Sequence, residues 1–175
     1  MIMTVEEFRT YCDTSEPDAM ISVKLQALEQ LIRKTTNNNF QNRNRRVTAD
    51  IISGSFSVGA YVPFKEGDTV QITESCMNEG LYTVNEVSGT SFTVKEDVDD
   101  ESNVLVTRID YPVDVKIGAV NMMKWDLENR DKVGIQSETI SRHSVTYFNM
   151  DGENSSLGYP KSLTGFLKPY MKARF

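Results

Sequence analysis

The spacing of apolar residues changes twice along the chain, and this change most limits what the chain can fold into. Before Val47 and after Pro112, apolar residues recur every three to four positions, as on one face of a helix. Between these points, runs such as "DTVQITES" and "SFTVKE" alternate with a period of two, which is typical of half-buried strands. We therefore predict an α+β chain in which strands interrupt a helical region.

The stretch from Val47 to Tyr111 is predicted to form a small all-β domain. It holds five or six short alternating runs, separated by glycines at turn positions. Short strands at such even spacing favour an antiparallel barrel or an antiparallel sandwich. The predicted domains are therefore a discontinuous helical domain, 1–46 with 112–175, and an inserted β domain, 47–111.

Two helices are predicted before the β stretch. "TVEE" has the Thr-x-x-Glu spacing of a capping box, which predicts a helix from Thr4 to Cys12. Ser15 and Asp18 repeat that spacing, and Pro17 would occupy the first turn of a second helix that runs to Lys34. The consecutive asparagines of "TTNNNF" favour a turn and end this helix.

A third helix is predicted after Pro112, with one buried side formed by Val113, Ile117, Val120, Met123 and Leu127. Gly118 in its middle costs about 1 kcal/mol relative to Ala, which predicts that another group packs closely there. "KVGIQSETISRHSVTYF" follows as an extended or hairpin arm.

A last helix is expected from Pro160 to Lys168. Pro169 should end or kink it, because proline lacks the helical N–H donor, and this leaves residues 169–175 as a C-terminal tail.

Charge is divided unevenly along a chain whose net charge is −6. Val47–Pro112 holds twelve acidic and three basic residues, a net of −9, and the rest holds thirteen acidic and sixteen basic residues, a net of +3. This division favours two structural units. Complementary charges could join neighbouring copies, or negative groups near a channel could keep DNA from adhering. The negative total argues against a protein that coats nucleic acid.

The sequence carries none of the usual signals for membranes or secretion. No apolar run approaches the ~20 residues that span a bilayer, and "MIMTVEEFRT" lacks the pattern of a signal peptide. Cys12 and Cys76 are far apart, so we expect free thiols in a reducing compartment.

No residue set matches a known catalytic or ligand-binding pattern, so we predict no enzyme, no cofactor and no metal. His143 is the only histidine, and neighbouring positions on a strand point to opposite faces, so the residues beside it cannot complete a catalytic arrangement with it. "GSFSVGAY" lacks the lysine of a phosphate loop. "DVDDESNVLVTR" resembles a calcium loop at Asp97, Asp99 and Glu101, but Arg108 stands where the last ligand should be.

The basic run "NRNRR" contains Arg43, Arg45 and Arg46. These guanidinium groups can grip phosphates, or carboxylates of a neighbouring subunit, through bidentate contacts. A solvated junction between domains is the equal alternative, because one surface ion pair contributes only ~0–1 kcal/mol.

Several motifs in order resemble the head–tail connector (adaptor) proteins of long-tailed bacteriophages, also called head-completion or DNA-packaging proteins. The stretch from "YPVDVKIGAV" to "ETISRHSVTYF" matches the family pattern of a helix followed by "GIxSExI…SxTY", and "YPKSLTGFLKPYMKARF" matches its final helix and basic end. "FKEGDTVQITESCMNEGLYTVNEV" is similar to the β insert of connectors from phages of Gram-positive hosts. The matching residues are Gly134, Ile135, Ser137, Glu138, Ile140, Ser144, Thr146, Tyr147, Pro160, Leu167, Lys168, Pro169 and Tyr170.

The resemblance implies a structural virion protein without catalysis. Twelve copies would form a homo-oligomeric ring beneath the portal protein in the virion neck, after synthesis in the host bacterial cytoplasm. The ring would extend the DNA channel without sequence-specific DNA binding and would meet the tail-completion (stopper) protein. Glu138 joins the three arginines as a candidate for inter-subunit contacts. The candidates for portal binding are Phe166, Lys168, Tyr170, Met171, Lys172, Arg174 and Phe175.

Two other function classes are open at this stage. One is a monomeric binding module whose β barrel recognises a peptide or carbohydrate. The other is a nuclease, which the lack of clustered acidic and histidine ligands disfavours.

Overall fold

The computed structural model describes residues 1–132, 137–140, 143–146 and 153–173. These residues form an α+β protein with a closed antiparallel β barrel. The chain divides into two compact units, which we call the barrel unit and the helical unit. The barrel unit is Met1 with Asn39–Tyr111, and the helical unit is Ile2–Asn38 with Pro112–Phe175.

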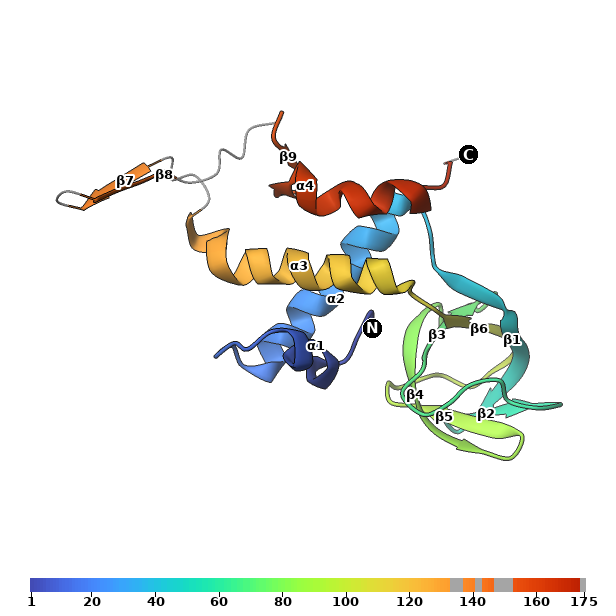
Figure 1. The fold of residues 1–175 in the computed structure, drawn as a ribbon. Helices are drawn as coiled ribbons and strands as arrows, with labels where there is room; N and C mark the ends of the chain where they lie inside the picture. Colours follow the sequence, from blue (N-terminus) through green and yellow to red (C-terminus); the bar gives the residue numbers. More distant parts are fainter. Residues whose placement is uncertain (133–136, 141–142, 147–152, 174–175) are drawn as a thin grey trace. The chain divides into compact units, whose positions relative to one another are not determined.

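The barrel closes in the strand order β1-β2-β5-β4-β3-β6, with β6 pairing back to β1 (Figure 1). Of the two predicted architectures, barrel and sandwich, the chain adopts the barrel. One of the predicted glycine turns is confirmed at Gly54, since Ser53 and Gly54 both have positive φ and join β1 to β2. The strands are β1 (Gln41–Ile52), β2 (Ser55–Val58), β3 (Thr69–Thr73), β4 (Gly80–Ser88), β5 (Ser91–Val94) and β6 (Glu101–Ile109).

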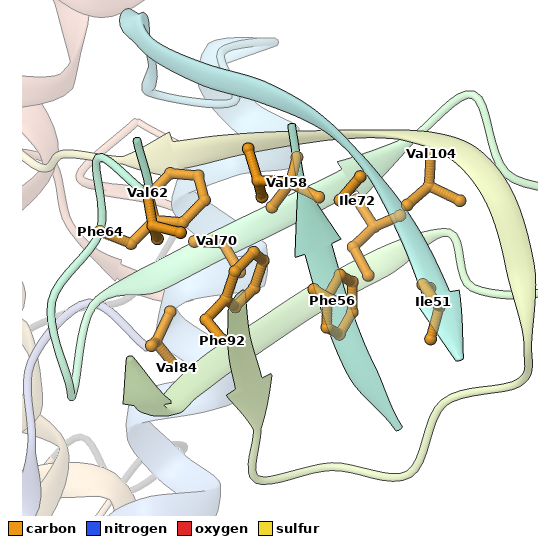
Figure 2. Packing of buried hydrophobic residues seen from close by; sticks show 12 residues of the cluster. Ile51, Phe56, Val58, Val62, Phe64, Val70, Ile72, Val84, Phe92 and Val104 are labelled. Atoms are coloured by element: carbon orange, nitrogen blue, oxygen red, sulfur yellow. The ribbon is translucent and has the colours of Figure 1, made fainter. Parts of the chain in front are cut away.

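Alternating side chains from these strands fill the interior of the barrel. Figure 2 shows Phe56, Phe92 and their aliphatic neighbours directed toward one another between the strands. The rings of Phe56 and Phe92 are stacked with centroids 4.6 Å apart, and Phe64 meets Phe92 edge-on at 5.3 Å. The period of two read from the sequence thus places its apolar residues in this core.

The barrel begins earlier than predicted, because the predicted boundary at Val47 falls inside β1. The residues before Val47 are polar and carry no alternation, yet they continue the strand alongside β6. Between Gln41 and Arg46 the register with β6 shifts, so part of this polar segment bulges out of the ladder.

The helical unit contains α1 (Val5–Tyr11), α2 (Asp18–Thr36), α3 (Val113–Asn129) and α4 (Lys161–Thr164). Thr4 caps α1 as predicted, by accepting a hydrogen bond from the Glu7 N–H at 3.0 Å. The predicted Ser15–Asp18 cap is wrong: Pro17 is the N-cap residue of α2, and Asp18 instead accepts hydrogen bonds from Arg9.

The face that α3 buries matches the prediction only in part. Val120 and Met123 are buried as predicted. Val113 and Ile117 are instead 71% and 50% exposed, whereas Val115 is fully buried. Because α3 carries apolar residues on more than one side, spacing alone did not identify the buried side.

The smaller elements follow α3 along the chain. The predicted arm includes the paired strands β7 (Ser137–Ile140) and β8 (His143–Thr146). The remaining elements are η1 (Arg130–Lys132), β9 (Ser155–Ser156), β10 (Tyr159–Pro160) and η2 (Gly165–Tyr170), of which η1 and η2 are 3₁₀-helices. Among the described residues, no helix is both long and apolar enough to cross a membrane.

Candidate functional site: the C-terminal surface

The last described segment, from Lys161 to Ala173, forms the candidate site. After one turn of α-helix, α4, the chain continues as the 3₁₀-helix η2 through Pro169 to Tyr170. The predicted helix from Pro160 to Lys168, ended or kinked by Pro169, is therefore corrected. The fixed φ of proline fits a 3₁₀ turn, so Pro169 does not end the helical path.

The backbone after η2 is hydrogen-bonded to the end of α2. The Lys172 N–H donates to the Thr36 carbonyl at 2.7 Å, and the Asn37 side-chain amide donates to the Ala173 carbonyl at 2.8 Å. The Asn38 amide donates to the Tyr170 carbonyl at 3.3 Å. The asparagines that were predicted to end α2 thus also fix the C-terminal segment.

Phe166 and Tyr170 pack against α3 within the same unit. A Cβ atom placed on Gly118 would lie only 2.3 Å from the Phe166 ring, which confirms the predicted close packing at this glycine. The Tyr170 hydroxyl donates to the Asp114 carboxylate at 2.8 Å, and this hydrogen bond raises the pKa of Tyr170 above its usual value of 10. These two rings therefore attach the segment to its own chain.

Other side chains of the segment point to solvent around an apolar pocket of about 360 Å³. Leu167 is buried at this site, whereas Met171 is 53% exposed. Lys168 and Lys172 are exposed as well. The pocket is lined by Thr35, Leu157, Lys161, Leu167, Lys168 and Met171, among others. It combines an apolar lining with cationic side chains.

The seven predicted portal-binding residues therefore fall into three groups. Lys168, Met171 and Lys172 are exposed, and the first two line the pocket. Phe166 and Tyr170 are half-buried against α3. Arg174 and Phe175 lie outside the described residues. No sequence pattern pointed to Leu157, which lies between β9 and β10 and has a positive φ of 60°.

The three arginines predicted at a domain junction belong to β1 of the barrel. Arg46 Nε donates to the Thr107 hydroxyl at 2.9 Å, and Arg45 donates to the Pro63 carbonyl at 3.2 Å, whereas Arg43 is exposed. Arg45 and Arg46 therefore have hydrogen-bond partners within their own barrel.

Moving these arginines into the barrel unit reduces the predicted charge contrast. Residues 39–111 hold twelve acidic and six basic residues, a net of −6, and the remaining residues hold thirteen of each sign. Glu138, the fourth candidate for inter-subunit contacts, lies in β7 and pairs with Val145 of β8.

In the segment that resembles a calcium loop, Glu101 binds another loop of the barrel. The Glu101 carboxylate accepts hydrogen bonds from the Ser75 hydroxyl, the Cys76 N–H and the Asn78 side-chain amide at 2.5–2.9 Å. These bonds, led by the one from Ser75, lower the pKa of Glu101 to about 2. In the described part of the chain, no three metal-ligating side chains gather in one place.

The chain matches no protein-family model and no curated protein. The functional argument therefore depends on the C-terminal surface, on the exposed faces of the helices and on the sequence motifs.

Proposed function

We propose that this protein is a structural head–tail connector of a long-tailed bacteriophage. In this proposal, copies form a twelve-membered ring beneath the portal protein in the virion neck, and the barrel is a domain inserted into the helical connector domain. The ring extends the DNA channel and presents a surface to the tail-completion protein. No catalytic step is part of this role.

The observation that carries the proposal is the exposed, cationic and apolar surface made by Lys168, Met171 and Lys172. Three hydrogen bonds to the end of α2 fix the backbone beneath these side chains. A partner that docks here does not have to order a free tail, which lowers the entropic cost of binding. An apolar lining with lysines around it fits a partner segment that is apolar and acidic.

A barrel that binds peptides or carbohydrates is the weaker candidate. The interior of the barrel is filled by its own aromatic and aliphatic side chains, so a ligand would have to bind to its outer surface (Figure 2).

The test combines the purified full chain with the portal protein encoded in the same genome. We expect a complex by native mass spectrometry and rings at the portal by electron microscopy. The double variant Lys168→Glu/Lys172→Glu should bind portal at least tenfold more weakly. The matched control Lys65→Glu/Lys95→Glu reverses two exposed lysines of the barrel and should bind normally. Absence of a complex with the unmodified chain would contradict the proposal.

A further inference from the structure

Between Ala19 and Gln30, one side of α2 is exposed and carries no charge, which is unusual for a surface helix. Met20 is 47% exposed and Val23 is 61% exposed. The charged residues between Ala19 and Gln30 lie on other sides of the helix. Glu29 is buried. Lys24 is half-buried, and its Nζ lies 3.9 Å from the Glu16 carboxylate and 4.0 Å from the Asp126 carboxylate. We call this surface the α2 stripe, and its exposed residues are Ala19, Met20, Val23, Gln26, Ala27 and Gln30.

A second uncharged row lies on α3. Val113, Ile117 and Asn121 are spaced four residues apart, so they lie above one another on one side of the helix. Val113 and Ile117 are 71% and 50% exposed, and Asn121 is exposed as well. We call these three residues the α3 stripe.

The two stripes face away from each other. Each lies on the side of its helix opposite the buried residues, which are Ile21, Leu25 and Leu28 on α2 and Val115, Ala119 and Met122 on α3. The two helices pack against each other and cross in Figure 1. Since the buried sides meet inside the helical unit, the stripes form two different surfaces on opposite sides of it.

We propose that copies of this chain associate head to tail, with the α2 stripe of one copy packed on the α3 stripe of the next. Two different surfaces on opposite sides of one unit make a heterologous contact, which repeats from copy to copy until a ring closes. Both stripes lack charge, so packing one on the other leaves no ion desolvated without a partner.

Charge at the ends of the stripes favours an antiparallel arrangement of the two helices. Lys34 lies in the last turn of α2, whereas Asp114 lies in the first turn of α3. An antiparallel contact brings the end of one helix toward the start of the other, so these opposite charges lie closer together than they would in a parallel contact. Asp114 keeps the hydrogen bond from Tyr170 of its own chain.

This inference deepens the proposed function and rests on it, because a connector ring requires such a pair of surfaces. The test uses the full-length variants Val23→Glu and Ile117→Glu, each of which places a charge in one stripe. We expect the unmodified chain to form rings, alone at high concentration or on the portal. Each variant should associate at least tenfold more weakly, as measured by analytical ultracentrifugation and native mass spectrometry.

Mixing the two variants gives the decisive result. The Val23→Glu chain keeps an intact α3 stripe, and the Ile117→Glu chain keeps an intact α2 stripe. The mixture should therefore form heterodimers that cannot grow further. Homodimers of either variant, or a mixture that stays monomeric, would overturn the proposal. So would an unmodified chain that stays monomeric up to its solubility limit and on the portal.

A control variant and a crosslinking experiment show whether lost association reflects the stripes or misfolding of the variants. Ile52→Glu changes a barrel residue that is 63% exposed, close to the exposure of Val23, and should leave association unchanged. In a chain with Cys12→Ser and Cys76→Ser, mixing Val23→Cys with Ile117→Cys chains should give crosslinks between the two variants. Crosslinks only between identical variants would overturn the head-to-tail contact.

The outcomes separate this inference from the proposed function. Self-association through the stripes without portal binding would refute the connector role and leave the head-to-tail contact standing. Portal rings that the Val23→Glu chain still forms would refute the contact and leave the connector role standing.

Discussion

The barrel unit and the helical unit bury their apolar residues in different ways. The barrel core consists of buried residues that all fall between Ala49 and Val106, in one continuous stretch of chain. The helical unit instead combines Ile21 and Leu25 from the first part of the chain with Met122 and Leu167 from the last part. The core of the barrel unit therefore comes from one continuous stretch of chain, whereas the core of the helical unit needs residues from both ends of the chain.

The two units also differ in what they leave exposed. Of the ten large apolar side chains that are exposed among the described residues, seven belong to the helical unit. The barrel has only Ile52, Tyr61 and Met77 in this class. The barrel therefore buries nearly all of its large apolar side chains, whereas the helical unit leaves more of them exposed.

The largest expected effect tests whether the barrel core is independent. Phe92→Ala removes a ring that contacts Phe56 and Phe64, and it should lower the free energy of barrel unfolding by about 3–5 kcal/mol. Trp125 is the only tryptophan and lies in the helical unit, so its fluorescence reports on that unit in urea.

Amide exchange of the strands reports on the barrel in the same experiment. We expect faster exchange in the strands while the Trp125 midpoint hardly moves. If strand exchange and the Trp125 midpoint changed together, the two units would not unfold independently. Tyr61→Ala, at a side chain that is 81% exposed, should change stability by no more than about 0.5 kcal/mol.

The next effect tests how the C-terminal segment packs on α3. Gly118→Ala should destabilise the unit by about 1–2 kcal/mol, because overpacking against Phe166 outweighs the gain in helix propensity. In a Phe166→Ala background the same change should instead stabilise, by up to about 1 kcal/mol. The measurement is a double-mutant cycle in urea. A destabilising Gly118→Ala in both backgrounds would show that the ring is not the obstacle.

A smaller effect tests the contact between α3 and β10. The Arg130 guanidinium lies 5.3 Å from the Trp125 ring centroid and 4.9 Å from that of Tyr159, and it pairs with Asp126. Arg130→Lys keeps the charge but loses the planar stacking, so we expect a loss of about 0.5–1 kcal/mol in thermal unfolding. Arg43→Lys, at an exposed barrel position, is the matched control and should be neutral. Equal effects of the two changes would contradict a role for the stacking.

The smallest expected effect is a dependence of barrel stability on pH, which comes from Glu101. Glu101 has a pKa of about 2 when folded, against an ordinary value of 4.5, so its stabilising contribution is present above pH 4.5. That contribution should be lost as pH falls from about 4.5 to 2. The Cys76 and Met77 amide resonances, whose N–H groups donate to Glu101, should titrate with a midpoint near 2. Glu101→Gln should abolish this titration, whereas Glu79→Gln should leave it intact.

Local patterns in the sequence predicted elements better than they predicted contacts. The alternation that begins at Val47 identified the barrel strands but missed the start of β1. The segment "NRNRR" has no apolar alternation, and its pairing with β6 decides its conformation. The Thr4 cap was predictable because both partners lie within one turn, whereas the Arg9–Asp18 pair that displaced the second predicted cap joins separate elements.

The candidate site was predictable only in part for the same reason. Gly118 indicated that a group packs closely on α3, but Phe166 lies 48 positions further along the chain, and only folding brings them together. Asn37 and Asn38 were readable as a helix stop through their turn preference. Their hydrogen bonds to Ala173 and Tyr170 follow from tertiary structure, which no local pattern encodes.

The helical unit takes its residues from both ends of the chain, so its two parts leave the ribosome at different times. Residues 39–111 can close their barrel as soon as Tyr111 leaves the exit tunnel, because every strand has then been translated. Residues 2–38 emerge first, yet they must wait for α3 and η2 before Ile21 and Leu25 are covered. A nascent chain therefore carries a finished barrel behind an unpaired amphipathic helix, and this helix is the part that a chaperone would bind during synthesis.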